Sequence, residues 1–298
     1  MRTTPLRVTA DLPKRAPTQG LAPLAPVDAD RIGQMAADAL LAELDTWPKP
    51  GLVSPFDNGS HDDMDYGTFL RSIAALRPFY TELAVAGSAD ADMNTLRRIG
   101  RRAEDAMLAA TGGVNTHRGA IFALGLLCAA AGAAGAERSP LSAERLMLAV
   151  GIRWGSEILR GPIPMNSHGS GALRRYGAGG ARSEAAQGFP HARDIGLPAL
   201  RAGRVLAGNE DAARVHTFFA LLAAMEDTNL LHRGGPEGLA DAHADARRFL
   251  LAGGVGRADW LARAIAVHRR FVARRLSPGG SADLLAVTIF LDRIERAP

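Results

Sequence analysis

Apolar residues recur every three or four positions along most of the chain, which is the spacing of one face of an α-helix. The first clear repeat is made by Ile32, Met35, Ala36, Ala39, Leu40 and Leu44. It ends at Pro48 and Pro50, which cannot continue a helix. No segment alternates convincingly between apolar and polar residues. The pattern therefore predicts an all-α fold, a compact domain of about ten helices.

Short polar connections separate the predicted helices. After a first helix that begins near Asp28, we expect helices over residues 66–76, 95–110, 120–134, 141–160, 197–208, 210–231, 236–252, 257–275 and 281–296. Pro78 is expected to kink or divide the helix that begins at residue 66. The most apolar stretch, residues 121–134, looks too short and too rich in glycine and alanine to span a membrane. We expect it to be the central helix.

Two stretches lack this periodicity. Residues 1–27 contain several prolines and no apolar repeat, which predicts an extended or mobile leader to a catalytic domain over residues 28–298. Residues 161–196 combine prolines with a run of glycines, which predicts a long irregular connection. Long loops inside compact domains commonly act as lids or binding loops.

Charge and composition narrow the possible partners. The net charge is +4, and Lys14 and Lys49 are the only lysines, so the positive charge is almost entirely arginine. Arginine suits phosphate because its guanidinium makes paired hydrogen bonds. No long basic stripe with interleaved aromatic residues appears, which argues against nucleic acid and for a small polyphosphate. The single cysteine, Cys128, fits a reducing compartment, and without a signal sequence we expect a cytoplasmic protein with no membrane partner.

The loop over residues 49–65 has an unusual set of polar side chains. These are Lys49, Asn58, His61, Asp62, Asp63 and Asp65. Closely spaced carboxylates suit Mg²⁺ that shares a phosphate, and a lysine meets a phosphate as a point charge. The alternative is a solvated acidic turn that caps the next helix.

A second polar group precedes the central helix. The glycine-hinged turn within residues 111–122 carries Asn115, Thr116, His117 and Arg118 side by side. Such a helix start suits an anion or a reacting sugar, because the free N–H groups and the helix dipole favour negative charge. In the simpler interpretation, Thr116 or Asn115 only caps the helix.

Three more stretches carry candidate chemistry. Arg182 and Glu184 lie in a glycine-rich loop that can close over a ligand, or form a surface ion pair of little value. At the end of an apolar helix stand Glu226, Asp227, Asn229, His232 and Arg233. Ser281 is expected to be a helix N-cap, with Asp283 in the first turn. The Walker A, dinucleotide-binding, zinc and nucleophile-elbow signatures are all missing.

Taken together, these stretches resemble the triphosphoribosyl-dephospho-coenzyme A synthase family, over residues 31–293. The shared motifs, in order, are Lys49-Pro-Gly-Leu-Val53, Asn58-Gly-Ser-His-x-Asp-Met64, Gly113-Val-Asn-Thr-His-Arg-Gly-Ala-Ile-Phe122, Gly188-Phe-Pro190, Asp227-Thr-Asn-Leu-Leu-His-Arg-Gly-Gly235 and Ser277-Pro-Gly-Gly-Ser-Ala-Asp-Leu-Leu-Ala286. The resemblance implies an enzyme that takes ATP and 3′-dephospho-CoA, releases adenine and joins the triphosphoribosyl unit to a ribose 2′-hydroxyl. Its product would be the prosthetic-group precursor for the acyl carrier subunit of citrate lyase or malonate decarboxylase. The loop around Arg182 looks more like the malonate decarboxylase branch.

Cleavage of an N-glycosidic bond needs a carboxylate near the sugar, a donor to the leaving base and a base for the incoming hydroxyl. We predict Asp227, Glu226 or Glu184 as the carboxylate, and His117 or His232 as the proton-transfer group. Lys49, Arg118 and Arg233 are predicted on phosphates, with Asp62, Asp63 and Asp65 near the Mg²⁺–triphosphate. Further substrate contacts are predicted at Asn58, His61, Asn115, Thr116, Arg182, Asn229 and Ser281.

Two alternatives stay open at this stage. A Mg²⁺-dependent glycohydrolase of the ADP-ribosyl type would cleave the same kind of bond with water as the acceptor. A non-catalytic helical nucleotide-binding protein would bind ATP without releasing adenine. The sequence does not determine the oligomeric state, and a homodimer is compatible with it.

Overall fold

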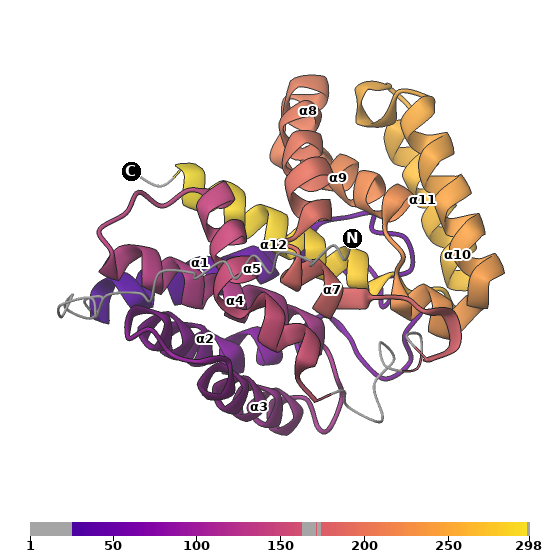
Figure 1. The fold of residues 1–298 in the computed structure, drawn as a ribbon. Helices are drawn as coiled ribbons and strands as arrows, with labels where there is room; N and C mark the ends of the chain where they lie inside the picture. Colours follow the sequence, from indigo (N-terminus) through magenta and orange to yellow (C-terminus); the bar gives the residue numbers. More distant parts are fainter. Residues whose placement is uncertain (1–25, 163–170, 172–173, 297–298) are drawn as a thin grey trace, which may run out of the picture.

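The computed structural model describes residues 26–162, 171 and 174–296. Within these ranges every regular element is helical and no β-strand occurs, which confirms the all-α prediction (Figure 1). The first helix begins at Pro26, slightly earlier than predicted. Almost all of the predicted leader, residues 1–25, lies outside the described part of the chain.

The helices follow closely along the chain. They are α1 (Pro26–Asp45), α2 (Tyr66–Ser88), α3 (Met93–Ala110), α4 (Arg118–Ala136), α5 (Ala143–Arg160), α7 (Gly180–Ala186), α8 (Leu197–Ala207), α9 (Glu210–Ala224), α10 (Thr228–Leu251), α11 (Trp260–Ala273) and α12 (Gly279–Arg296), with a π-helical turn at Ala192–Gly196 and a 3₁₀ turn at Gly254–Gly256. In Figure 1, α1 to α5 gather on one side, α8 to α11 on the other, and α12 runs between them.

The predicted central helix is α4. It is buried without a break from Ala123 to Ala134. By length and composition α4 is apolar enough to cross a membrane, which corrects the expectation that this stretch is too short. However, 78% of its most apolar window is buried inside the protein, so α4 serves as a core helix.

Helices α2 and α4 approach one another backbone to backbone. A Cβ atom added at Gly132 would lie 1.9 Å from the carbonyl oxygen of Ala84. A Cβ atom at Gly87 would lie 1.9 Å from the carbonyl oxygen of Ala129. Each helix therefore supplies a glycine where the other helix presses on it. The glycine and alanine content of α4 is explained by this close packing.

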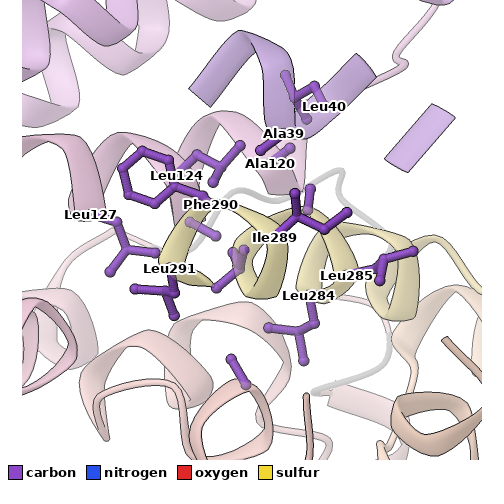
Figure 2. Packing of buried hydrophobic residues seen from close by; sticks show 14 of the residues in the cluster. Ala39, Leu40, Ala120, Leu124, Leu127, Leu284, Leu285, Ile289, Phe290 and Leu291 are labelled. Carbon is purple, nitrogen blue, oxygen red and sulfur yellow. The ribbon is translucent and has the colours of Figure 1, made fainter. Parts of the chain in front are cut away.

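Helix α12 is the second core helix. Figure 2 shows it beside α4 and α1, with apolar side chains on all sides. The labelled residues are Leu284, Leu285, Ile289, Phe290 and Leu291 of α12, Ala120, Leu124 and Leu127 of α4, and Ala39 and Leu40 of α1. Because α12 also contacts α9, it connects the two sides of the molecule.

The prediction of one helix over residues 210–231 is wrong. Helix α9 ends at Ala224, and Met225 is extended, with φ −80° and ψ 135°. Asp227 then caps a new helix, α10. The polar group from Glu226 onward thus begins a helix and does not end one. The predicted break near residue 235 is a kink inside α10, at Gly235 with φ 64°.

Other predicted boundaries also need correction. Ser281 is not an N-cap, because α12 already begins at Gly279. Pro78 does not divide α2, which continues to Ser88. The stretch 161–196, predicted to be irregular, contains α7 and the π-helical turn; its residues 163–170 and 172–173 lie outside the described part.

Candidate active site

One carboxylate joins the starts of α10 and α12. Asp227 is completely buried, and its Oδ1 accepts hydrogen bonds from the N–H groups of Asn229 (2.9 Å) and Leu230 (3.4 Å). Its Oδ2 accepts from the N–H (2.8 Å) and the hydroxyl (3.0 Å) of Ser281. Burial raises the pKa of Asp227, and these four donors oppose that shift. The predicted partners Asp227, Asn229 and Ser281 are therefore neighbours in space.

A second carboxylate joins the starts of α12 and α4. Asp283, which lies in the second turn of α12 and not in the first as predicted, is so close to Gly119 that an added Cβ atom there would be 2.0 Å from its Oδ2. The N–H of Ala120 donates a hydrogen bond to this carboxylate. Three helix N-termini therefore meet at one place. Their dipoles favour negative charge, which the carboxylates of Asp227 and Asp283 carry here by accepting from N–H groups of these helices.

A buried ion pair lies beside these helix starts. Lys49 is 1% exposed, and its Nζ lies 3.0 Å from Oε1 of Glu43. The same Nζ donates to the carbonyl oxygens of Glu43 and Leu44. Burial raises the pKa of Glu43 and lowers that of Lys49, while the charge of each partner opposes the shift. The lysine predicted on a phosphate is thus held from within the protein.

His117 is the most unusual of the buried polar side chains beside these helix starts. Its ring is buried, and Nδ1 lies 2.7 Å from the hydroxyl of Ser72, which accepts a hydrogen bond from Thr116 at 2.8 Å. When the Ser72 hydroxyl donates its hydrogen bond to Nδ1, the imidazole is neutral and its ring hydrogen is on Nε2. That Nε2 is buried and has no hydrogen-bond partner in the described part of the chain. Burial, and then the charge of Lys49, lower the pKa of His117 to about 3.

The loop over residues 49–65 packs beside the start of α12. It borders the buried polar side chains described above, and we call this border the rim. His61 Nε2 lies 2.8 Å from the hydroxyl of Ser277, and its Nδ1 lies 3.4 Å from the guanidinium of Arg233. Arg233 also donates to the carbonyl oxygens of Ser60 and Arg275, each at 3.2 Å. Two predicted substrate contacts, His61 and Arg233, therefore lie side by side.

The exposed part of this rim carries the predicted magnesium ligands. Asp62 forms an ion pair with Arg275, and Asp63 lies 3.7 Å from His61. The third, Asp65, caps α2 by accepting from the N–H of Thr68 at 2.7 Å. Within the described residues, no three His, Cys, Asp or Glu side chains are arranged to hold a metal ion. Asp65 is thus engaged as a helix cap, while Asp62 and Asp63 are exposed at the surface.

Several predicted site residues are engaged in contacts that fix the helices. Arg118 donates to Glu104 of α3 at 2.6 Å, and Asn115 caps the start of α4. Arg182 donates to the carbonyl oxygens at the end of α5, including that of Pro162 at 2.7 Å. This arrangement identifies Arg182 as a cap of α5.

The remaining acidic and polar candidates differ in exposure. Glu184 is buried and binds His191 twice, at its N–H (2.8 Å) and at Nδ1 (2.7 Å). Glu226, Asn58 and His232 are exposed at the surface. Among the predicted acids, Asp227 alone belongs to the buried group at the three helix starts.

Sequence reasoning missed three members of this group. Glu43 stands on the buried face of α1. Its place within the apolar repeat is the one feature of the sequence that indicates a buried acid. Ser72 lies on α2 beside His117. His268 of α11 fixes the 49–65 loop, with Nδ1 3.1 Å from the carbonyl oxygen of Lys49 and Nε2 3.1 Å from Asp57.

Comparison with known proteins identifies the family. A family model described as ATP:dephospho-CoA triphosphoribosyl transferase matches residues 29–298. A protein of Stutzerimonas stutzeri, named as a probable 2-(5''-triphosphoribosyl)-3'-dephosphocoenzyme-A synthase, is 40% identical over 279 residues, covering 92% of this chain and 94% of the relative. A protein of the same name from Pseudomonas fluorescens is 42% identical over 276 residues, covering 90% of this chain and 92% of the relative.

A third relative with this name, from Acinetobacter calcoaceticus, is 38% identical over 271 residues. The match covers 90% of this chain and 92% of the relative. No solved structure matches the chain. The match extends over nearly the whole described chain, including every motif that surrounds the three helix starts. The chain is therefore an enzyme of the ATP:dephospho-CoA triphosphoribosyl transferase family.

Proposed function

We propose that this enzyme transfers the triphosphoribosyl unit of ATP to the ribose 2′-hydroxyl of 3′-dephospho-CoA and releases adenine. The family match supports the two substrates. The observation that carries the proposal is the meeting of three helix N-termini with buried carboxylates and a neutral imidazole. A retained triphosphate needs an electropositive place to bind, and the sugar needs carboxylates close by.

The triphosphate is proposed to bind at the helix starts and at the rim. Arg233 and Arg118 would hold its oxygens, the latter in exchange for its contact with Glu104. Lys49 would act through its charge, since its protons already have acceptors inside the protein. Mg²⁺ would enter with ATP, and Asp62 or Asp63 would supply one or two oxygens beside the phosphates. The cation then neutralises charge on the phosphates.

The sugar is proposed to lie above the buried group. Asp227 is preferred to Glu226 and Glu184 as the carboxylate that stabilises positive charge on the ribose. Its support is its place between two helix starts; because it is 0% exposed and holds four protein donors, it would act on the ribose through its charge. Glu184, which binds His191, does not belong to that buried group. His117 is preferred to His232 as the group that donates a hydrogen bond to the departing adenine. The reason is that the buried Nε2 of His117 has no partner in the described part of the chain.

The product is proposed to be the precursor of the prosthetic group of an acyl carrier subunit. The support is the resemblance of the motifs to the malonate decarboxylase branch, and citrate lyase is the alternative destination. The enzyme would then act in the cytoplasm.

The proposed function is tested by incubating the purified chain with ATP and Mg²⁺, with and without 3′-dephospho-CoA, and measuring adenine by chromatography. We expect adenine only when the acceptor is present. Adenine without the acceptor would indicate a glycohydrolase instead. Binding of ATP without any adenine would indicate a non-catalytic nucleotide-binding protein.

A further inference from the structure

Asp283 differs from the two other acids at the helix starts. Glu43 is paired with Lys49, and Asp227 is completely buried among four donors. Asp283 remains partly exposed, and the hydrogen bond that reaches its carboxylate is the one from the N–H of Ala120. Of the three acids, Asp283 is therefore the least buried.

Building on the transfer reaction proposed above, we propose that Asp283 is the base that takes the proton from the incoming ribose 2′-hydroxyl. No motif-based prediction gave Asp283 this role. The proposal rests on its partial exposure, its fixed position and the groups around it.

The position of Asp283 is set by two core helices. It stands in the second turn of α12, where the next residues, Leu284 and Leu285, are buried in the core. Its carboxylate presses on Gly119, where any side chain would occupy the same space. Gly119 is two positions from His117, whose Nε2 is buried and unpartnered in the described part of the chain. A proton acceptor and a hydrogen donor thus stand at one helix start.

The surroundings of Asp283 favour its action as a base. Burial raises its pKa well above the ordinary value, and the nearby carboxylates of Glu43 and Asp227 raise it further. The N–H of Ala120 opposes this shift, and the hydroxyl of Tyr80 lies near enough to be affected by its charge. A carboxylate with a raised pKa accepts a proton more readily at neutral pH than an exposed one does.

The proposed step conserves atoms and electrons. The bond from the anomeric carbon to adenine breaks, and its electron pair leaves with the adenine nitrogen. The 2′-oxygen forms the new bond to that carbon, and its proton moves to a carboxylate oxygen of Asp283. The adenine nitrogen then takes up one proton while Asp283 releases one to solvent. No oxidant, reductant or further reactant is needed.

The test compares Asp283→Asn with Glu295→Gln, an exposed acid on the same helix. In Asp283→Asn, kcat for adenine release is expected to fall about 100-fold or more, as for loss of a general base. The KM for dephospho-CoA should change little. The rise of kcat with pH on the acid side should disappear in Asp283→Asn and persist in Glu295→Gln.

A second variant separates chemistry from folding. Asp283→Ala leaves space for a small carboxylate, so added formate should restore part of its adenine release, while formate should not accelerate the wild-type enzyme. A kcat within about threefold of wild type in Asp283→Asn would overturn the proposal. So would a loss that formate does not relieve together with an unchanged pH profile. Failure of the wild-type enzyme to release adenine would instead refute the proposed function itself.

Discussion

Asp227 stabilises two helix starts with one side chain. Four donors surround its carboxylate, and the Asp227 side chain is 0% exposed to solvent. An amide in its place would turn an N–H₂ group toward the N–H and hydroxyl of Ser281. A buried donor would then face other donors, which is among the costly defects in a protein interior.

We therefore expect Asp227→Asn to lower the free energy of unfolding by about 3 kcal/mol. Asp92→Asn is the matched control, because Asp92 caps α3 through Thr95 at the surface and asparagine caps helices about as well as aspartate. Urea unfolding of both variants measures the difference. Equal stability of the two variants would contradict the structural role of Asp227, and normal adenine release by Asp227→Asn would remove it from the chemistry.

His117 makes folding sensitive to acid. Its pKa is lowered to about 3, so between pH 6.5 and about 3 the unfolded chain binds a proton here that the folded chain does not bind. This contribution to stability is fully present above pH 6.5 and is lost as the pH falls toward about 3. The loss amounts to about 1.4 kcal/mol per pH unit within that window.

His117→Gln should remove this part of the pH dependence. Because all other titrating groups are shared, the difference in unfolding free energy between wild type and variant isolates His117. We expect that difference to change steadily as the pH falls below 6.5, measured by urea unfolding at a series of pH values. Parallel curves would contradict the neutral, buried state of the imidazole.

At this scale the sequence predicts which polar residues lie near one another better than it predicts the contacts that each side chain makes. Asp227, His117 and His61 belong to the described group, because each is one of several polar residues beside a helix start. Arg182 looks equally suitable, yet it caps α5, since a sequence does not show which acceptors lie within range of a long side chain. Glu43 escapes notice because one acid in an apolar repeat resembles a surface residue.

At the scale of elements, glycine positions decide how closely α2 and α4 pack. Gly132 faces the backbone of α2, where an added methyl group has no space. Gly100 of α3 has no atom within 4 Å of its would-be Cβ. The same substitution at the two sites should therefore have opposite effects.

Gly132→Ala is expected to destabilise the protein by about 3 kcal/mol, because backbone on both sides would have to move. Gly100→Ala should stabilise it by about 0.5–1 kcal/mol, since alanine is the better helix former. Thermal or urea unfolding measures both. A destabilised Gly100→Ala, or an unaffected Gly132→Ala, would contradict the described packing.

Element prediction succeeded where apolar periodicity was long. The central helix α4 is a continuous apolar run, so its place in the core follows from its composition. The end of α9 was missed because no proline or glycine marks it; the chain turns at Met225, and Asp227 starts a new helix with its side chain. Such a break depends on a tertiary contact, here with Ser281, that no local pattern contains.

At the scale of the whole molecule, the order of the motifs along the chain predicts one site, and the fold supplies the way they meet. The helices α4, α10 and α12 are far apart in sequence, and the two core helices, α4 and α12, have their N-termini in contact through Gly119 and Asp283. This meeting point could not be derived from periodicity, because helix spacing does not determine which helix ends are neighbours. The meeting of these helix starts explains why polar motifs directly precede the two core helices, α4 and α12.

The central claim is that the molecule transfers an intact triphosphoribosyl unit. The most direct measurement follows a radiolabel on the γ-phosphate of ATP, together with adenine, in a reaction that contains 3′-dephospho-CoA. The account predicts that label appears on the acceptor in equal amount to the adenine released. Adenine accompanied by labelled free ribose triphosphate, or by label in inorganic phosphate, would contradict it.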